Sequence, residues 1–218
     1  MRVAIVASTS GSVYRFASRV PFVREQIALV VSDRECGALA AARQLGHPTV
    51  ILPHAGGLAF SDALRELADA QGIDLIVSFY TRLFHGPLLD AYEGRLINFH
   101  PSILPACPGR DGFGDTIRAG TRFIGSTVHL VDTGMDTGRP LIQASAPNDP
   151  ALPLAERRHR VFVQQCRSLV QVIRWYADGR VRLDAQGVNV ADTRFDLAEF
   201  VPNLDCIEAI AFDAPFPG

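Results

Sequence analysis

An amide and an imidazole stand two residues apart in the segment Asn98-Phe99-His100-Pro101-Ser102. Because side chains alternate along a strand, Asn98 and His100 would project from the same face at a strand end. Together they could stabilise a developing oxyanion, and the imidazole could also transfer a proton near neutral pH. The competing interpretation is a structural histidine beside a proline turn, which is the commoner role of a lone histidine.

Two carboxylates lie in the glycine-rich segment Asp132-Thr133-Gly134-Met135-Asp136-Thr137-Gly138. They could bind a cation, orient the histidine or form Asx turns, and turns are the default interpretation. No other ligand cluster supports a metal site. The trio Asn98, His100 and Asp136 contains no protein nucleophile, and the GxSxG motif of serine hydrolases is absent. The substrate would therefore supply the nucleophile, as when an amine attacks an activated acyl carbon.

A third cluster of small polar residues is Ser8-Thr9-Ser10-Gly11-Ser12, directly after an apolar run. At a strand-to-helix turn, such residues leave backbone N–H groups pointing at one spot, which favours an anion such as phosphate. The equally plain alternative is that Ser10 or Ser12 only caps the following helix. The dinucleotide pattern GxGxxG is absent, which argues against a nicotinamide cofactor.

The composition excludes several classes of protein. The 218 residues carry a net charge of −2, so no basic field indicates a nucleic acid or an acidic membrane as partner. All 21 basic residues are arginine, which excludes Schiff-base and Walker-type lysines. The four cysteines are widely separated and show no metal-ligand spacing, and no stretch is long and apolar enough to span a membrane. We therefore expect a reduced, cytoplasmic setting.

Alternating strand and helix patterns fill the first half of the chain. Strands are predicted at 2–7, 27–31, 49–52, 75–78 and 95–98, and helices at 13–19, within 33–46, at 61–71 and at 88–92. Residues 98–114 are predicted as a loop, followed by strands at 123–131 and 140–146, a helix at 154–176 and a strand from Val181. This order predicts an α/β fold with a mostly parallel sheet covered by helices on both faces. Ligands of such sheets bind beyond the carboxyl ends of the strands, where the first and third clusters would lie.

The sequence resembles the folate-dependent formyltransferases, most closely the phosphoribosylglycinamide formyltransferase group. The segments LINFHPSILPACPG, GSTVHLVDTGMDTGRPLIQ and VIRWYADGRVRL carry the resemblance, which extends from Met1 to about Leu183. It implies a Rossmann-like formyltransferase domain over residues 1–183, with 184–218 as a C-terminal extension of unknown role. It also implies transfer of a formyl group from 10-formyltetrahydrofolate, as co-substrate, to the amine of a small phosphorylated substrate. In this group that substrate is glycinamide ribonucleotide, in purine biosynthesis.

The resemblance also implies roles for individual residues. Asn98 would bind the formyl oxygen, His100 as the imidazolium would stabilise the oxyanion, and Asp136 would support His100 and help to relay a proton. The folate would contact Arg82, Leu83, Phe84, Thr133, Gly134, Met135 and Gly138. The phosphorylated amine would contact Gly11, Ser12, Val13, Pro101 and Gln165.

The departures from the family pattern occur at positions expected to lie near the amine substrate. The phosphate loop reads Ser-Gly-Ser-Val, and the side chain of Val13 cannot donate a hydrogen bond. Gln165 and Cys166 stand where the family has an acidic residue and a histidine, and Arg110-Asp111-Gly112-Phe113 stands where it has histidines. Three alternatives therefore remain: another amine, such as a nucleotide-linked amino sugar, water as acceptor in a formyltetrahydrofolate hydrolase, and a folate- or nucleotide-binding module without activity. We expect no nucleic-acid or membrane partner and no metal, while the apolar stretches of the tail leave a homodimer as an option.

Overall fold

The computed structural model describes residues 1–53, 55–184 and 187–216. Eight strands follow the order β10-β7-β6-β5-β4-β1-β2-β3, and β8 and β9 form a separate pair. The chain divides into two compact units, 1–98 with 130–138 and 99–129 with 139–218. Strand β5 (Leu96–His100) passes from the first unit to the second after Asn98. The predicted α/β class with a mostly parallel sheet is confirmed.

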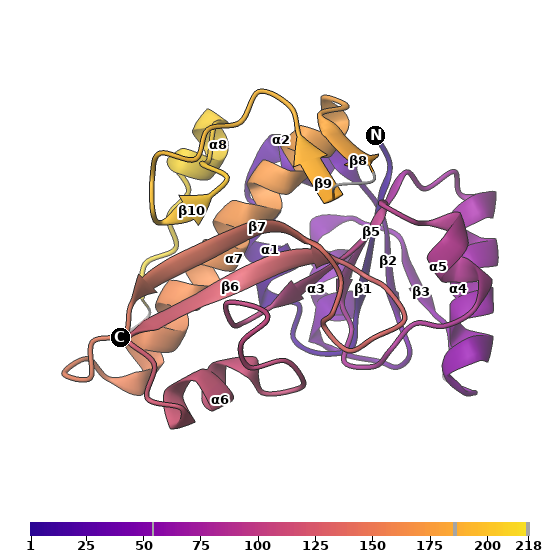
Figure 1. The fold of residues 1–218 in the computed structure, drawn as a ribbon. Coiled ribbons are helices and arrows are strands. Elements are labelled where there is room, and N and C mark those ends of the chain that lie inside the picture. The colour runs from indigo at the N-terminus through magenta and orange to yellow at the C-terminus, as the bar shows by residue number, and fades with distance from the viewer. Residues whose placement is uncertain (54, 185–186, 217–218) are drawn as a thin grey trace. The chain divides into compact units, whose positions relative to one another are not determined.

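The first unit is built on parallel strands (Figure 1). These are β1 (Val3–Ala7), β2 (Ile27–Ser32), β3 (Thr49–Ile51), β4 (Leu75–Phe79) and the start of β5. Its helices are α1 (Ser12–Ala17), α2 (Pro21–Gln26), α3 (Gly37–Leu45), α4 (Gly57–Ala70) and α5 (Pro87–Ala91). Every residue of β1 is buried, as expected of a strand covered on both faces.

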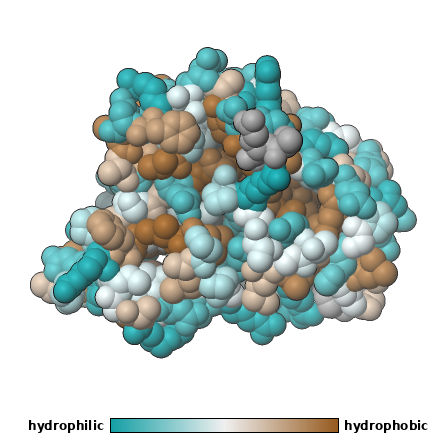
Figure 2. Space-filling view, in the orientation of Figure 1, coloured by the Kyte–Doolittle hydropathy of each residue, from teal (hydrophilic) through white to brown (hydrophobic). Residues whose placement is uncertain are grey.

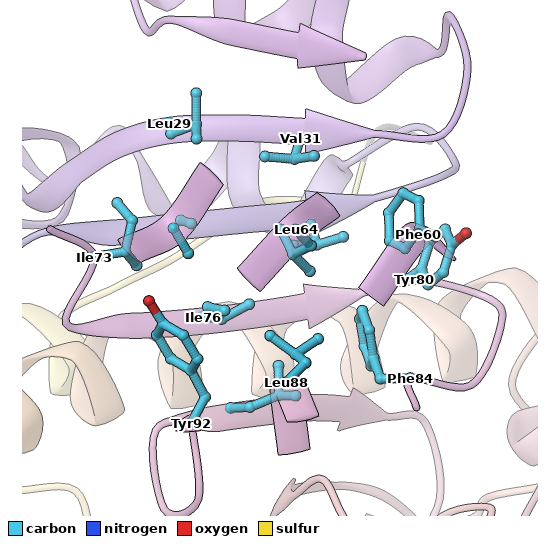
Figure 3. Packing of buried hydrophobic residues seen from close by; sticks show 14 residues of the cluster. Leu29, Val31, Phe60, Leu64, Ile73, Ile76, Tyr80, Phe84, Leu88 and Tyr92 are labelled. Atoms are coloured by element: carbon cyan, nitrogen blue, oxygen red, sulfur yellow. The ribbon is translucent and has the colours of Figure 1, made fainter. Parts of the chain in front are cut away.

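One face of these strands packs against α4 and α5 (Figure 3). Leu29 and Val31 from β2 and Ile76 from β4 lie in one buried cluster with Leu64 of α4 and Leu88 of α5. The cluster is almost wholly buried, and burying a leucine-sized side chain contributes roughly 1.5–3 kcal/mol to folding. In the sheet, Val6 near the end of β1 pairs with Val31 of β2, and Ala7 pairs with Phe79 of β4. The site residues of this unit follow these strand ends.

The second unit is built on antiparallel strands. Strand β6 (Phe123–Leu130) pairs with β7 (Pro140–Pro147), which pairs in turn with β10 (Phe200–Val201). The helices are α6 (Gly112–Arg118), α7 (Leu154–Ala177) and α8 (Ile207–Ile210), and β8 (Val181–Asp184) pairs with β9 (Gly187–Val190). No helix among the described residues is long and apolar enough to cross a membrane.

Residues 187–216 belong to this second unit and contact its helix α7. Asp205 accepts hydrogen bonds from Gln171 and Trp175 of α7 at 2.7 and 3.2 Å, and from Arg180 at 2.7 Å. Gln171 and Trp175 are completely buried, so Asp205 satisfies donors that solvent cannot reach. The tail, which showed no period in sequence, is therefore held by contacts with residues some 30 positions away.

Candidate active site

In the first unit, the residues that follow three neighbouring strands come together. Ser8 follows β1, Asp33 follows β2, and Tyr80 and Thr81 follow β4. The hydroxyls of Ser8 and Thr81 lie 3.0 Å apart, and the Thr81 N–H donates to the Ser8 hydroxyl at 3.3 Å. The carboxyl ends of the parallel strands thus carry a polar edge, as the strand order predicts.

The loop from Ser8 to Gly11 is held against the start of α3. The Ala38 N–H donates to the Thr9 carbonyl at 3.0 Å, and a Cβ added to Gly11 would lie 2.6 Å from the Cβ of Ala38. Gly11 has φ of 62° and precedes the first residue of α1, so a residue with a side chain would be both strained and crowded there. Because the cap residue is this glycine, the interpretation of Ser10 or Ser12 as a side-chain cap is wrong.

The two predicted substrate-binding residues Ser12 and Val13 of this loop differ in how far their side chains are exposed. Ser12 is half-buried, whereas Val13 is 7% exposed and packs into the core. The side chain of Val13 is therefore a packing group, and only backbone polar groups at position 13 can serve a ligand. The charge needed to hold a phosphate must come from elsewhere.

The segment Arg82-Leu83-Phe84, predicted to contact the folate, also follows β4. Phe84 is 3% exposed, and its ring packs on Tyr80 and Phe60 with centroids 5.5 and 6.5 Å apart. The ring of Phe84 is therefore part of the core, and only the backbone groups of this residue can contact a ligand. Arg82 and Leu83 are exposed.

The turn after β6 is organised by Asp132. Its Oδ1 accepts hydrogen bonds from the Gly134 N–H at 3.0 Å and from the Thr137 hydroxyl at 2.7 Å. The Asx-turn interpretation therefore holds for Asp132. Asp136 stands within this turn in the left-handed region, with φ of 56°, and Met135 is half exposed. The predicted folate residues Thr133 to Gly138 all belong to the first unit, as do Arg82 to Phe84 and Asn98.

The second unit holds His100 at the end of β5. The imidazole is 3% exposed, and its Nε2 lies 2.8 Å from the carbonyl oxygen of Cys107. A carbonyl can only accept, so Nε2 carries a proton and Nδ1 is the nitrogen whose protonation gives the imidazolium. Gly112 packs against the same ring, because a Cβ there would lie 2.4 Å from Nε2.

The loop after His100 is pinned to β6 and β7. The Leu104 N–H donates to the hydroxyl of Thr127 at 3.0 Å, and that hydroxyl donates to the Ser102 carbonyl at 2.8 Å. Gln143 donates to the Leu104 carbonyl at 2.7 Å. Pro101 begins this loop, and Gln165 is half-buried on α7 in the same unit.

Sequence reasoning missed several residues that shape these sites. Cys107 and Gly112, which contact His100, lie in the segment 98–114, which was predicted as a loop, and neither was assigned a contact with His100. Asp33 and Arg34 were assigned only to a loop before α3, although Asp33 follows a buried strand just as Ser8 does. That shared position at a strand end is the signal that could have identified them. No group of three potential metal ligands occurs in residues 1–53, 55–184 and 187–216.

Comparison with known proteins places the chain in a family. The family model described as "Formyl transferase" matches residues 1–173. The chain belongs to the formyl transferase family. The predicted resemblance to folate-dependent formyltransferases is thereby confirmed.

The relatives of this chain include several phosphoribosylglycinamide formyltransferases. The chloroplastic protein of Vigna unguiculata is 32% identical over 199 residues, which cover 82% of this chain and 64% of that protein. The Bacillus subtilis protein is 43% identical over 108 residues, covering 47% and 55%. This chain thus spans less than two thirds of the length of both relatives. The Mycobacterium tuberculosis H37Rv protein is 34% identical, covering 79% and 83%.

Two solved structures share the fold of this chain. Glycinamide ribonucleotide transformylase 1 from Symbiobacterium toebii superposes with a TM-score of 0.82 at 30% identity, covering 88% of this chain and 94% of that one. A formyltetrahydrofolate deformylase from Pseudomonas syringae superposes with a TM-score of 0.76 at 18% identity, covering 88% and 66%. The second likeness concerns the fold alone.

Proposed function

We propose that this chain transfers a formyl group from 10-formyltetrahydrofolate to the amine of glycinamide ribonucleotide, a step of purine biosynthesis. Membership of the formyl transferase family and the names of its relatives support this assignment. The observation that carries it is the state of His100, which is buried at a strand end with Nε2 held by a backbone carbonyl. A ring held in this way keeps its orientation through the reaction.

The reaction needs no nucleophile from the protein. The amine nitrogen attacks the formyl carbon and forms a C–N bond, which gives a tetrahedral intermediate with a negatively charged oxygen. In our proposal the Asn98 amide and the His100 imidazolium donate hydrogen bonds to that oxygen. The intermediate then breaks its bond to the folate nitrogen, and the proton lost by the amine reaches that nitrogen through water with the help of Asp136. The products are the formylated amine and tetrahydrofolate.

The folate would lie against the first unit. Arg82, Leu83 and the backbone of Phe84 would contact its ring, and Thr133, Gly134, Met135 and Gly138 would form the other wall. Two observations support this role: the ring of Phe84 is buried, which leaves backbone groups for recognition, and Asp132 holds the turn in one conformation. A turn stabilised before binding costs less entropy when the ligand arrives.

The amine substrate would contact Gly11, Ser12, Val13, Pro101 and Gln165. A neutral glutamine holds an ammonium group less strongly than a carboxylate does. Gln165 and Val13 therefore favour one second candidate, transfer to a different amine such as a nucleotide-linked amino sugar. Both candidates keep the same formyl donor and the same three residues at the reacting carbonyl.

Purified protein incubated with 10-formyltetrahydrofolate and a panel of amines separates these functions. We expect tetrahydrofolate release that depends on glycinamide ribonucleotide. Release that depends on another amine would move the assignment to the second candidate. Release without any amine would indicate a hydrolase, and tight folate binding without release would indicate a binding module.

We also propose a cytoplasmic setting and self-association through the tail. All four cysteines are free thiols, which suits a reducing compartment. Apolar atoms gather over α8 and β10 (Figure 2), where Ile207 and Ile210 are 71% and 51% exposed. Sedimentation equilibrium should give a dimer that the pair of substitutions Ile207→Ser and Ile210→Ser converts to a monomer. A monomeric wild type would refute the proposal of a dimer.

A further inference from the structure

Two arginines converge on one buried carboxylate at the carboxyl edge of the first unit. The side chain of Asp33 is only 2% exposed, yet Arg34 and Arg82 each bring a nitrogen to its Oδ2, at 3.6 and 3.7 Å. The two guanidinium-bearing side chains remain 49% and 42% exposed. Two positive charges and one negative charge leave a net positive charge at the solvent side of this edge.

Both guanidinium groups compensate the buried carboxylate through charge, at ion-pair distances. Distances of 3.6 and 3.7 Å are ion-pair distances and exceed those of hydrogen bonds. Oδ1 of Asp33 is buried and accepts no hydrogen bond from any described residue. Burial and the charge of Asp33 also raise the pKa of Tyr80, which follows β4, to about 12. The buried carboxylate of Asp33 therefore positions both guanidinium groups near the strand ends.

Arg34 lies beside the loop predicted to hold the substrate phosphate. Its Nη2 donates to the carbonyl of Ser8 at 3.3 Å, at the point where that loop begins. The segment after Arg34 locks onto the same loop, since Ala38 bonds to Thr9 and the Cβ of Ala38 packs against Gly11. The two loops that follow β1 and β2 are thus joined by these contacts, with Arg34 beside them.

We infer that Arg34 binds the phosphate group of the amine substrate, with Asp33 as its positioning residue. The inference rests on the proposed function, because it assigns a further residue to the same acceptor. It accounts for the loss of a side-chain donor at Val13: a guanidinium supplies several N–H donors and a full charge, and this geometry suits phosphate oxygens. Arg82, which pairs with the same Oδ2 of Asp33, stays with the folate segment.

Binding of inorganic phosphate tests the inference without relying on activity. Titration calorimetry at pH 8 and constant ionic strength, with chloride as the competing ion, would compare the wild type with Arg34→Gln, Arg34→Lys and Arg65→Gln. Arg65 is the matched control, because it pairs with Asp69 on α4 at 3.2 Å, away from the strand ends. We expect Arg34→Gln to weaken phosphate binding about tenfold, as for loss of one partly exposed charge-assisted hydrogen bond, and Arg34→Lys to restore part of it.

Steady-state kinetics distinguish this inference from the function on which it rests. Arg34→Gln should raise the KM for glycinamide ribonucleotide about tenfold and leave kcat and the KM for 10-formyltetrahydrofolate nearly unchanged. A wild type that binds no phosphate, or an Arg34→Gln variant that binds it equally well, would overturn the inference. A rise in the folate KM instead would also overturn it, since Arg34 would then serve the folate carboxylates. Failure of the proposed function would show differently, as a wild type that formylates no glycinamide ribonucleotide while the phosphate titration still reports on Arg34.

Discussion

The ring of His100 lies against the backbone of Gly112, where an added Cβ would come within 2.4 Å of Nε2. Gly112 is the first residue of α6, and this helix is capped by Asp111, whose side chain accepts a hydrogen bond from the Gly114 N–H at 3.2 Å. The segment in which this chain departs from the family's histidines therefore supplies the surface that supports the imidazole.

Replacing Gly112 with alanine should displace the imidazole and lower kcat at least tenfold. The reason is steric, because the new methyl group would meet a ring that Cys107 already holds at 2.8 Å. The matched control is Gly120→Asn, at the end of the same helix, where φ is 64° and nothing lies within 4 Å of an added Cβ. Asparagine tolerates that conformation, so activity should persist. Equal activity of Gly112→Ala and the wild type would show that the contact with His100 is unimportant.

Asp136→Asn should fold normally and lose roughly 10²–10³ in turnover, the magnitude typical of losing one group that stabilises the transition state. The substitution suits the backbone, because φ at this position is 56° and asparagine adopts the left-handed region readily. Circular dichroism and tetrahydrofolate release would measure fold and turnover. Asp132→Asn is the control, since its Oδ1 could still accept from Gly134 and Thr137. Wild-type turnover in Asp136→Asn would refute its role.

Asp205→Ala should reduce the free energy of unfolding by about 3 kcal/mol, because it leaves the buried donors of Gln171 and Trp175 without an acceptor. Denaturation by urea would measure the change. Asp213→Ala, at an exposed position of the same tail, should change stability by less than about 0.5 kcal/mol. Equal stability of the two variants would mean that the tail contributes little to the fold of the second unit.

The pair of Tyr14 and His47 should make stability depend on pH. The Tyr14 hydroxyl lies 2.5 Å from Nδ1 of His47, and Nε2 donates to the Arg24 carbonyl at 3.1 Å, so the folded state holds the neutral ring. Burial, the largest cause, lowers the pKa of His47 below its ordinary value of 6.5. Just below pH 6.5 the unfolded chain binds a proton that the folded chain does not, so stability falls as the pH drops.

Urea denaturation between pH 8 and pH 5 would measure this loss. His47→Gln keeps a polar side chain but cannot titrate, so its stability should change less across the same range. His85→Gln, at an exposed position, should behave like the wild type. If His47→Gln shows the full wild-type dependence on pH, other groups account for it.

Much of the first unit could be predicted from the sequence because its signals are local. Each of the parallel strands is a short apolar run, and the predicted strands at 2–7, 27–31, 49–52, 75–78 and 95–98 all occur within two residues. The helix predicted to begin at Ser61 begins at Gly57 instead. The Ser61 hydroxyl bonds to the Gly57 carbonyl inside α4 and accepts the His85 N–H, so this serine is an interior residue rather than a cap.

Elements that are stabilised by contacts distant in sequence could not be predicted from the sequence. Helix α6 begins in a glycine-rich segment that reads as a loop, but Phe113 packs against Ile124 and Val161 and stabilises it. Strand β10 has only two residues, and it exists because Phe200 and Val201 pair with β7. Helix α2 is six residues long with a proline at its start, too short to show a period. The strands of the first unit were predictable from the sequence, whereas the convergence of Arg34 and Arg82 on Asp33 required the tertiary arrangement.

Transfer of a labelled formyl group tests the central claim most directly. The protein would be supplied with 10-formyltetrahydrofolate carrying ¹³C in its formyl group together with glycinamide ribonucleotide. We predict that the label appears in a new amide of the ribonucleotide, in a one-to-one ratio with tetrahydrofolate, and that Asp136→Asn nearly abolishes both products. Label found only in formate, or an unlabelled ribonucleotide after complete consumption of the donor, would contradict the account.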